Sequence, residues 1–219
     1  MNNNKLLIFG AGGHAKKVAL QAQANGYSII GAISTESIGT PFLNSIVLGN
    51  ISDYLINNEF KAYLIHIAIG ENSVRKLIYD QIVEYSDRLT SIFSLDSHIS
   101  NYSIIGNGTY IGTGACILNN VNIGENCIID TNVIVDHDTM ISDFVNISPG
   151  AVLCSHINVG YGAIIGAGAT IIERVTIGEG SLIGAGSVVI KDVEPFNLVV
   201  GNPAKFVKRR SFYDMYLKK

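Results

Sequence analysis

The sequence predicts two structurally different parts: an α/β domain in residues 1–92, then an all-β parallel β-helix in residues 93–195, with a C-terminal segment, 196–219. Two observations carry this prediction. Short apolar runs alternate with helical patterns in the first part, and an aliphatic residue recurs at every sixth position in the second. A period of six matches neither the 3.6-residue turn of an α-helix nor the simple alternation of a hairpin sheet, so the two parts need different folds.

The front part begins with an apolar strand pattern at Lys5–Phe9, a glycine turn at Gly10–Gly13 and a helical pattern at His14–Asn25. This alternation predicts a small Rossmann-like α/β domain with a parallel sheet, which binds ligands at the carboxyl ends of its strands. The other expected elements are strands at Tyr27–Ile33 and Ala62–Ile69 and a helix at Asn72–Tyr85.

The glycine turn has the form of a dinucleotide-binding fingerprint, Gly10-x-Gly12-x-x-Ala15. In an NAD-binding domain an acidic residue follows the second strand, whereas here Ser34 and Thr35 follow it. The domain is also too short for both halves of a full dinucleotide fold. We therefore expect this turn to bind one nucleotide diphosphate at the helix N-terminus, and not NAD.

The repeat in the second part begins at Ile99 and places Ile, Leu or Val at sixteen consecutive positions of spacing six, ending at Val189. A second and mostly small residue lies two positions before each of them, so both face one side of a short strand. Gly or Asn often lies three residues after the aliphatic residue, and both tolerate the positive φ of a tight corner. One strand and one corner in every six residues is the signature of a parallel β-helix.

Composition and charge exclude several classes of protein. Hydrophobic residues make up 47% of the 219 residues and charged residues only 15%, with a net charge of −3 and a basic C-terminus. This argues against a nucleic-acid-binding protein, which carries a broad basic face. Three cysteines are too few for a disulfide framework or a four-thiolate zinc site. Without a signal peptide pattern or a long apolar run, we expect a cytoplasmic protein with no membrane association.

An ordered set of motifs extends over nearly the whole chain and resembles the NeuD/PglD-type sugar acetyltransferases. The resemblance implies a left-handed β-helix with three hexads in each coil, a front domain that holds a nucleotide-sugar acceptor, acetyl-CoA bound along the β-helix between neighbouring subunits, and a functional homotrimer. The motifs that carry it are Ile8–His14, Ala68–Asn72 with Arg75, Asp136–Asp138, Ser148–Ala151 and Gly201–Lys205.

Transfer of an acetyl group from a thioester to an amine needs a general base and a donor for the oxyanion, but no covalent nucleophile and no metal. His137 matches the base of the family and lies at an outward corner of the repeat. Asp138 follows it and raises the basicity of the imidazole. Some family members carry a second histidine nine residues after the base, where this chain has Asn146.

The remaining candidate residues divide by ligand. For the nucleotide sugar we expect glycine-turn residues and polar residues near the strand ends, and for acetyl-CoA we expect residues along the later coils and a cationic residue beyond them. The nucleotide-sugar set is Gly10, Gly12, Gly13, His14, Ser34, Gly70, Asn72 and Arg75; the acetyl-CoA set is Asn146, Ser155, His156, Gly166, Ala167, Ala185, Pro203 and Lys205.

The resemblance favours N-acetylation of a nucleotide-linked amino sugar, of the 4-amino-4,6-dideoxy type, for surface glycan biosynthesis. Three alternatives stay open. The first is O-acetylation of a sialic-acid-type sugar. The second is a carbonic anhydrase with the same repeat, which needs three histidines in zinc geometry, and we place only His137 and His156 in the β-helix. The third is a noncatalytic nucleotide-sugar-binding protein.

Overall fold

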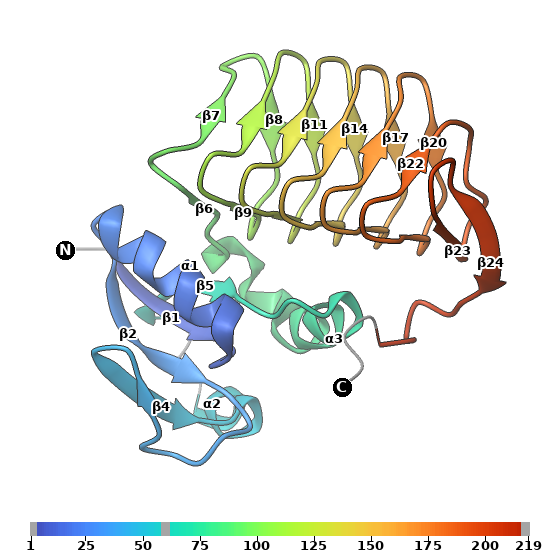
Figure 1. The fold of residues 1–219 in the computed structure, drawn as a ribbon. Coiled ribbons are helices and arrows are strands. Elements are labelled where there is room, and N and C mark those ends of the chain that lie inside the picture. Colours follow the sequence, from blue (N-terminus) through green and yellow to red (C-terminus); the bar gives the residue numbers. More distant parts are fainter. Residues whose placement is uncertain (1–3, 58–61, 216–219) are drawn as a thin grey trace.

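The computed structural model describes residues 4–57 and 62–215, and it has the predicted fold class, an N-terminal α/β domain followed by a left-handed parallel β-helix (Figure 1). The front domain, blue to cyan in Figure 1, lies along one side of the β-helix, and the last strands lie at its far end. Among the described residues no helix is both long and apolar enough to cross a membrane.

The front domain is built on a five-stranded sheet of order β3-β4-β2-β1-β5, parallel except for the edge strand β3. Its central strand β1 is buried on both sides: Leu6 and Ile8 pack towards α1, and Leu7 and Phe9 pack towards α3. A strand covered on both faces needs a continuous apolar run, which this one has. The strands are β1 (Lys5–Phe9), β2 (Ser28–Ile33), β3 (Pro41–Phe42), β4 (Ser45–Gly49) and β5 (Leu64–Ile67), and the helices are α1 (Gly13–Ala24), α2 (Ile51–Asn57) and α3 (Asn72–Ile82).

The structure adds three elements to those predicted for the front domain. β3, β4 and α2 are too short to produce a detectable periodicity, so the sequence analysis did not find them. The helix expected at Asn72–Tyr85 is α-helical only to Ile82 and continues as a 3₁₀ helix over Val83–Arg88.

The β-helix is a three-faced prism of two-residue strands. One face, the docking face, contains β6, β9, β12, β15, β18 and β21; the β7 face contains β7, β10, β13, β16, β19 and β22; the β8 face contains β8, β11, β14, β17 and β20. The sixteen predicted hexads correspond to β7–β22, and β6 precedes them. The strands are β6 (Ile92–Phe93), β7 (His98–Ile99), β8 (Ile104–Ile105), β9 (Tyr110–Ile111), β10 (Cys116–Ile117), β11 (Asn122–Ile123), β12 (Ile128–Ile129), β13 (Ile134–Val135), β14 (Met140–Ile141), β15 (Asn146–Ile147), β16 (Val152–Leu153), β17 (Asn158–Val159), β18 (Ile164–Ile165), β19 (Thr170–Ile171), β20 (Thr176–Ile177), β21 (Leu182–Ile183) and β22 (Val188–Val189).

The second residue of most strands points into the prism and forms a single apolar core with the small residue two positions before it. Strands one coil apart pair in register with a spacing of 18 residues, as Cys116 with Ile134 and Ile134 with Val152. The last coil is covered by β23 (Asn197–Val200), parallel to β21, and by β24 (Lys205–Arg209), antiparallel to β23. The sequence analysis placed only His137 and His156 in the β-helix. This was wrong, because His98 in β7 also belongs to it.

Candidate active site

His137 lies at the edge of the prism where the β7 face meets the β8 face, directly after β13. Its Nδ1 is 2.7 Å from Asp138 Oδ2, and the amide of Asn120, one coil earlier, donates to Asp138 Oδ1 at 2.6 Å. Because an ionised carboxylate only accepts hydrogen bonds, the ring proton belongs on Nδ1 and the lone pair on Nε2. The sequence analysis missed Asn120, which fixes the carboxylate that orients the His137 ring.

Charge around this corner favours a basic imidazole. The hydrogen bond with Asp138 raises the pKa of His137, with a further contribution from Asp136. Hydrogen bonds from Asn120 and His137 lower the pKa of Asp138, so its carboxylate is ionised at neutral pH. His137 is about half exposed, which leaves its ring accessible to a substrate.

The structure places His156 beside His137, as the 19-residue separation predicted. The two rings are 5.4 Å apart between centroids and nearly perpendicular, and His156 Nε2 is 3.7 Å from Asp138 Oδ2. His156 and Asp138 occupy the same corner position in successive coils and both have positive φ. Ser155 is next to His156 on this edge, so these two acetyl-CoA candidates lie near His137.

A second concave site, the interdomain pocket, lies between the front domain and the docking face. It has a volume of about 410 Å³ and contains five of the predicted ligand contacts together with residues that the sequence analysis missed. It is lined by Gly13, His14, Lys17, Gly70, Ile128, Asp130, Asn146, Ser148, Pro149 and Ala167.

His14 is a half-buried residue of the interdomain pocket, and its Nε2 atom is buried. Burial, followed by the nearby charge of Lys17, lowers the pKa of His14 to about 3, so its imidazole is neutral at physiological pH. The ring meets Tyr110 edge-on at 5.2 Å. Its Nε2 has no hydrogen-bond partner among the residues that the structure describes. A buried nitrogen in this state is suited to a hydrogen bond with a ligand in the pocket.

Lys17 and Asp130 form an ion pair across the domain junction, with 2.6 Å between Nζ and Oδ1. Burial raises the pKa of Asp130, but the hydrogen bonds from Lys17 and Thr131 and the charge of Lys17 together outweigh burial and lower this pKa overall. Lys17 follows His14 by one helical turn, and Asp130 precedes Asp136 by one hexad. These spacings were visible in the sequence, but only the docking of the two domains brings the two residues together.

The glycines of the first turn differ in whether the folded backbone itself requires glycine. Gly10 has a φ of +112°, and a Cβ there would lie 2.8 Å from the Ala68 carbonyl, so its backbone requires glycine. Gly12 and Gly13 are exposed, have ordinary φ values, and have open space where a Cβ would lie. No packing contact explains glycine at these two positions, whereas close approach of a ligand to the N-terminus of α1 does.

Gly10 and Ser34 lie in a separate and mostly apolar cavity, the front-domain pocket, of about 180 Å³. It lies at the carboxyl ends of β1 and β2, where parallel α/β sheets bind ligands. Thr35, Asn50 and Val74 also line it. Five of the eight predicted nucleotide-sugar residues therefore divide between this pocket and the interdomain pocket, and Gly12, Asn72 and Arg75 line neither.

Arg75 and Asn72 have a structural position that does not fit the predicted contact with phosphate. Arg75 is 1% exposed, and all five of its N–H groups donate within the chain: to the carbonyls of Asn126, Ile69, Gly70 and Phe144 and to Asn72 Oδ1. Burial lowers the pKa of Arg75 to about 10, so it remains charged at neutral pH. Its contacts join α3 to the β-helix and leave no donor for a ligand.

Half of the acetyl-CoA candidates lie on the edge where the docking face meets the β7 face. Pro149, Ala167 and Ala185 follow one another at 18-residue intervals along this edge, and Pro203 lies 18 residues further on; all four are exposed. Gly166 is packed under Ala185, because a Cβ on it would lie 2.5 Å from the Ala185 nitrogen. The row begins at the interdomain pocket. Lys205 lines a surface pocket of about 220 Å³ at the C-terminal end.

Asn146 is buried in the interdomain pocket, where its side-chain amide donates to the Gly70 carbonyl at 3.1 Å. It therefore lies on the docking face, away from His137 of the same chain, as its half-coil separation predicted.

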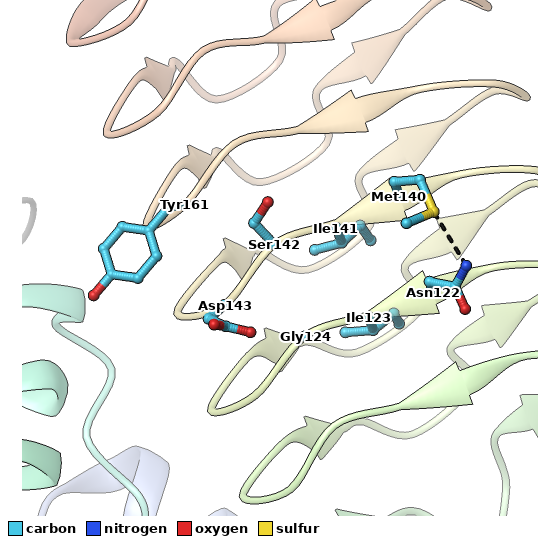
Figure 2. Close-up of a pocket in the computed structure, with 8 residues that line it drawn as sticks. All are labelled: Asn122, Ile123, Gly124, Met140, Ile141, Ser142, Asp143 and Tyr161. Atoms are coloured by element: carbon cyan, nitrogen blue, oxygen red, sulfur yellow. Dashed lines mark hydrogen bonds between the residues drawn. The ribbon is translucent and has the colours of Figure 1, made fainter.

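A further groove, with a volume of about 470 Å³, lies on the β8 face (Figure 2). Figure 2 shows Asn122 and Met140 side by side on neighbouring strands, joined by a 3.1 Å contact from the Asn122 amide to the Met140 sulfur. Tyr161 and Asp143 lie at the other end of the groove. None of the residues predicted to act in catalysis or ligand binding lines this groove.

Comparison with known proteins identifies the family. Residues 5–82 match the family model of the PglD N-terminal domain. The acetyltransferase domain of PglB from Neisseria gonorrhoeae has the same architecture over 94% of this chain and 100% of that chain, with 33% identity and a TM-score of 0.88. The chain belongs to the NeuD/PglD-type sugar acetyltransferases. It is therefore an enzyme of the acyltransferase class.

Two other solved structures resemble this NeuD/PglD-type enzyme. A variant of perosamine N-acetyltransferase from Caulobacter crescentus, solved with CoA and GDP-perosamine, is 28% identical with a TM-score of 0.86, over 93% of this chain and 97% of that chain. WeeI from Acinetobacter baumannii is 26% identical with a TM-score of 0.85, over 92% of this chain and 99% of that chain. No curated protein sequence matches the chain.

Proposed function

We propose that the enzyme transfers the acetyl group of acetyl-CoA to the amino group of a nucleotide-linked 4-amino-4,6-dideoxy sugar, in the synthesis of a surface glycan. The observation that carries the proposal is the His137–Asp138 pair, which leaves a basic nitrogen exposed at a corner of the prism. Similar structures contain CoA with GDP-perosamine, and the PglB domain was solved with acetyl coenzyme A. Both support this choice of donor and acceptor.

The reaction needs one proton transfer before or during attack. The amine nitrogen attacks the thioester carbonyl, and His137 Nε2 takes a proton from it, while Asp138 stabilises the imidazolium through Nδ1–H. The tetrahedral intermediate then collapses to the amide and releases the CoA thiolate, which takes the proton from the His137 imidazolium and so regenerates the base. The acetyl group passes directly from donor to acceptor, so no covalent acetyl-enzyme forms.

For the acceptor, we place the nucleoside in the front-domain pocket and the diphosphate at Gly12 and Gly13. The amino sugar then extends into the interdomain pocket. There the neutral His14 offers a hydrogen bond, and the ionised Asp130 attracts the substrate amine. For acetyl-CoA, the row from Pro149 to Pro203 offers an exposed edge of small residues, and Lys205 at its end supplies charge for the CoA phosphates.

The same geometry supports a homotrimer with shared active sites. The front domain covers the docking face, whereas His137 lies on the opposite edge, between the other two faces. Within one chain the base therefore cannot meet the interdomain pocket. A second copy that packs its His137 edge towards this pocket completes the site. Exposed Met140 and Ile104 on the adjacent β8 face favour burial in such an interface.

The shared site predicts complementation between inactive chains. At a nucleotide-sugar concentration too low for Gly12→Val alone to give measurable turnover, we expect chains with His137→Ala and chains with Gly12→Val to regain activity when they are unfolded and refolded together. Random mixing in equal amounts leaves about one quarter of the sites with both parts intact, so about a quarter of wild-type activity should return. The measurement is the acetyl-transfer rate of refolded mixtures, with each variant refolded alone as the control. Mixtures as inactive as the separate variants would contradict the shared site.

Gly12→Val is expected to raise the KM for the nucleotide sugar by more than the KM for acetyl-CoA. The added side chain has room in the folded protein, so it acts by obstructing the approach of the diphosphate to the backbone of α1. Ala24→Val, at the other end of α1 and exposed, is the control for added side-chain bulk away from the pocket. Equal increases in the two KM values would argue against this placement of the acceptor.

Asp138→Asn is expected to shift the acidic limb of the pH–kcat profile to lower pH. The carboxylate raises the pKa of His137, so its removal lets the imidazole lose its proton at a lower pH. The maximal rate should fall less than in a His137 variant, because Asn still accepts the Nδ1–H hydrogen bond. A pH profile of kcat tests this; an unshifted acidic limb would show that another group controls it.

The proposed function is tested by incubating the purified enzyme with acetyl-CoA and a panel of UDP-, dTDP- and GDP-linked amino sugars. Release of CoA with at least one of them, and a product that gains one acetyl group, is the expected result. Stability of the product to mild alkali identifies an amide, whereas loss of the acetyl group identifies the ester of an O-acetyltransferase. The absence of turnover with every amino sugar would overturn the proposal.

A further inference from the structure

The corner that holds the base contains three groups that bind metal ions. One ligand atom from each of His137, Asp138 and His156 lies within 4.8 Å of the others. Two imidazoles and one carboxylate form a donor set that Zn²⁺ and related ions prefer, and exposure leaves room for water as a fourth ligand.

The distances are close to those of a bound ion. Two ligands of a tetrahedral Zn²⁺ lie roughly 3.3 Å apart, given metal–ligand bonds of about 2.0–2.1 Å. His156 Nε2 is 3.7 Å from Asp138 Oδ2, and His137 Nδ1 is 2.7 Å from the same oxygen. Small rotations of three exposed side chains therefore bring the set to the required geometry.

The backbone already holds the three ligands together. The His156 amide donates to the His137 carbonyl at 3.1 Å, which fixes the two coils at this corner. Asn120 binds the other oxygen of Asp138 and directs Oδ2 towards the two rings. Asp136, whose carboxylate is 4.0 Å from the His137 ring nitrogen, adds negative charge near the cluster. Little conformational freedom has to be lost when an ion binds.

We propose that His137, Asp138 and His156 form a binding site for Zn²⁺ or a similar transition-metal ion, and that the bound ion inhibits the enzyme. Metal on Nδ1 of His137 puts the single ring proton on Nε2, so Nε2 no longer has the lone pair that accepts the substrate proton. The site has only two histidines, so it differs from the three-histidine centre of a carbonic anhydrase. The inhibition rests on the proposed role of His137, whereas the binding itself does not.

The binding is tested by isothermal titration calorimetry of the full-length, metal-free protein with Zn²⁺, independently of activity. We expect one ion per chain in wild type and an affinity at least about tenfold lower in His156→Asn. Asparagine suits this corner, because Asn120 and Asn132 occupy equivalent corners with positive φ. His98→Asn, which changes another exposed histidine of the prism, is the matched control and should bind Zn²⁺ as wild type does.

A second measurement follows the reaction by chromatography of the acetylated sugar at buffered free Zn²⁺, because free CoA thiol also binds the ion. Micromolar Zn²⁺ should inhibit wild type and the His98→Asn variant, and a chelator should restore their rates. With each rate expressed as a fraction of the same variant's metal-free rate, His156→Asn should need a Zn²⁺ concentration at least about tenfold higher for the same fractional inhibition. Equal Zn²⁺ affinity in wild type and His156→Asn, or no binding at submillimolar Zn²⁺, would overturn the metal site. Binding without inhibition would overturn the inhibitory role and leave the site.

Discussion

Replacement of His137 by alanine or asparagine is expected to lower kcat by about 10²-fold or more, because a positioned general base contributes typically 10² to 10⁴. The imidazole Nε2 is the basic nitrogen that Asp138 prepares, through its bond to Nδ1, for the substrate proton. Without it, the proton has to pass to water. Steady-state kinetics with saturating acetyl-CoA and amino sugar give the comparison.

The fold should survive this substitution. The His137 side chain is 48% exposed, and its polar partners Asp136 and Asp138 remain hydrated without it. His98→Asn again serves as a control, since His98 is exposed in the first coil, away from the proposed site. Thermal unfolding of each variant should match wild type. A His137→Ala enzyme with near wild-type kcat would require another base.

Replacement of Arg75 by methionine is expected to destabilise the protein by about 3 kcal/mol or more, because buried acceptors lose their only charged donor. Its five N–H groups serve carbonyls of the β-helix, at Asn126 and Phe144, and acceptors of the front domain, at Ile69, Gly70 and Asn72. Methionine fills much of the volume but donates to none of them. The hydrogen bonds that are lost are therefore those that join the front domain to the β-helix.

The measurement is thermal and urea unfolding of Arg75→Met, with Arg75→Lys and Arg209→Met for comparison. Lysine retains the charge but has three donors on one nitrogen, so we expect an intermediate effect. Arg209 is exposed in β24, and its replacement should change the midpoint little. Limited proteolysis should also release the front domain from Arg75→Met more readily than from wild type. An unchanged midpoint together with an increased KM for the nucleotide sugar would restore Arg75 to the ligand-binding residues.

The sequence by itself determined the β-helix and the position of the corner that holds His137. A hexad repeat is a local property: each strand and corner has the same geometry, so a separation of about 18 residues places two side chains on adjacent coils at one edge. For this reason the neighbourhood of His137 and His156 followed from counting along the chain, and the structure confirms it. The glycine turn, β1 and α1 were equally readable, because their patterns are local too.

The tertiary structure decided what the repeat does not encode, namely which residues meet where the two domains join. Arg75 has the sequence context of a phosphate ligand, yet docking of α3 on the prism turns it into a buried structural contact. Lys17 and Asp130 are 113 positions apart, and neither is notable alone, but together they line the interdomain pocket. Contacts between domains depend on the relative placement of two separately folded surfaces, and no period within either domain specifies that placement.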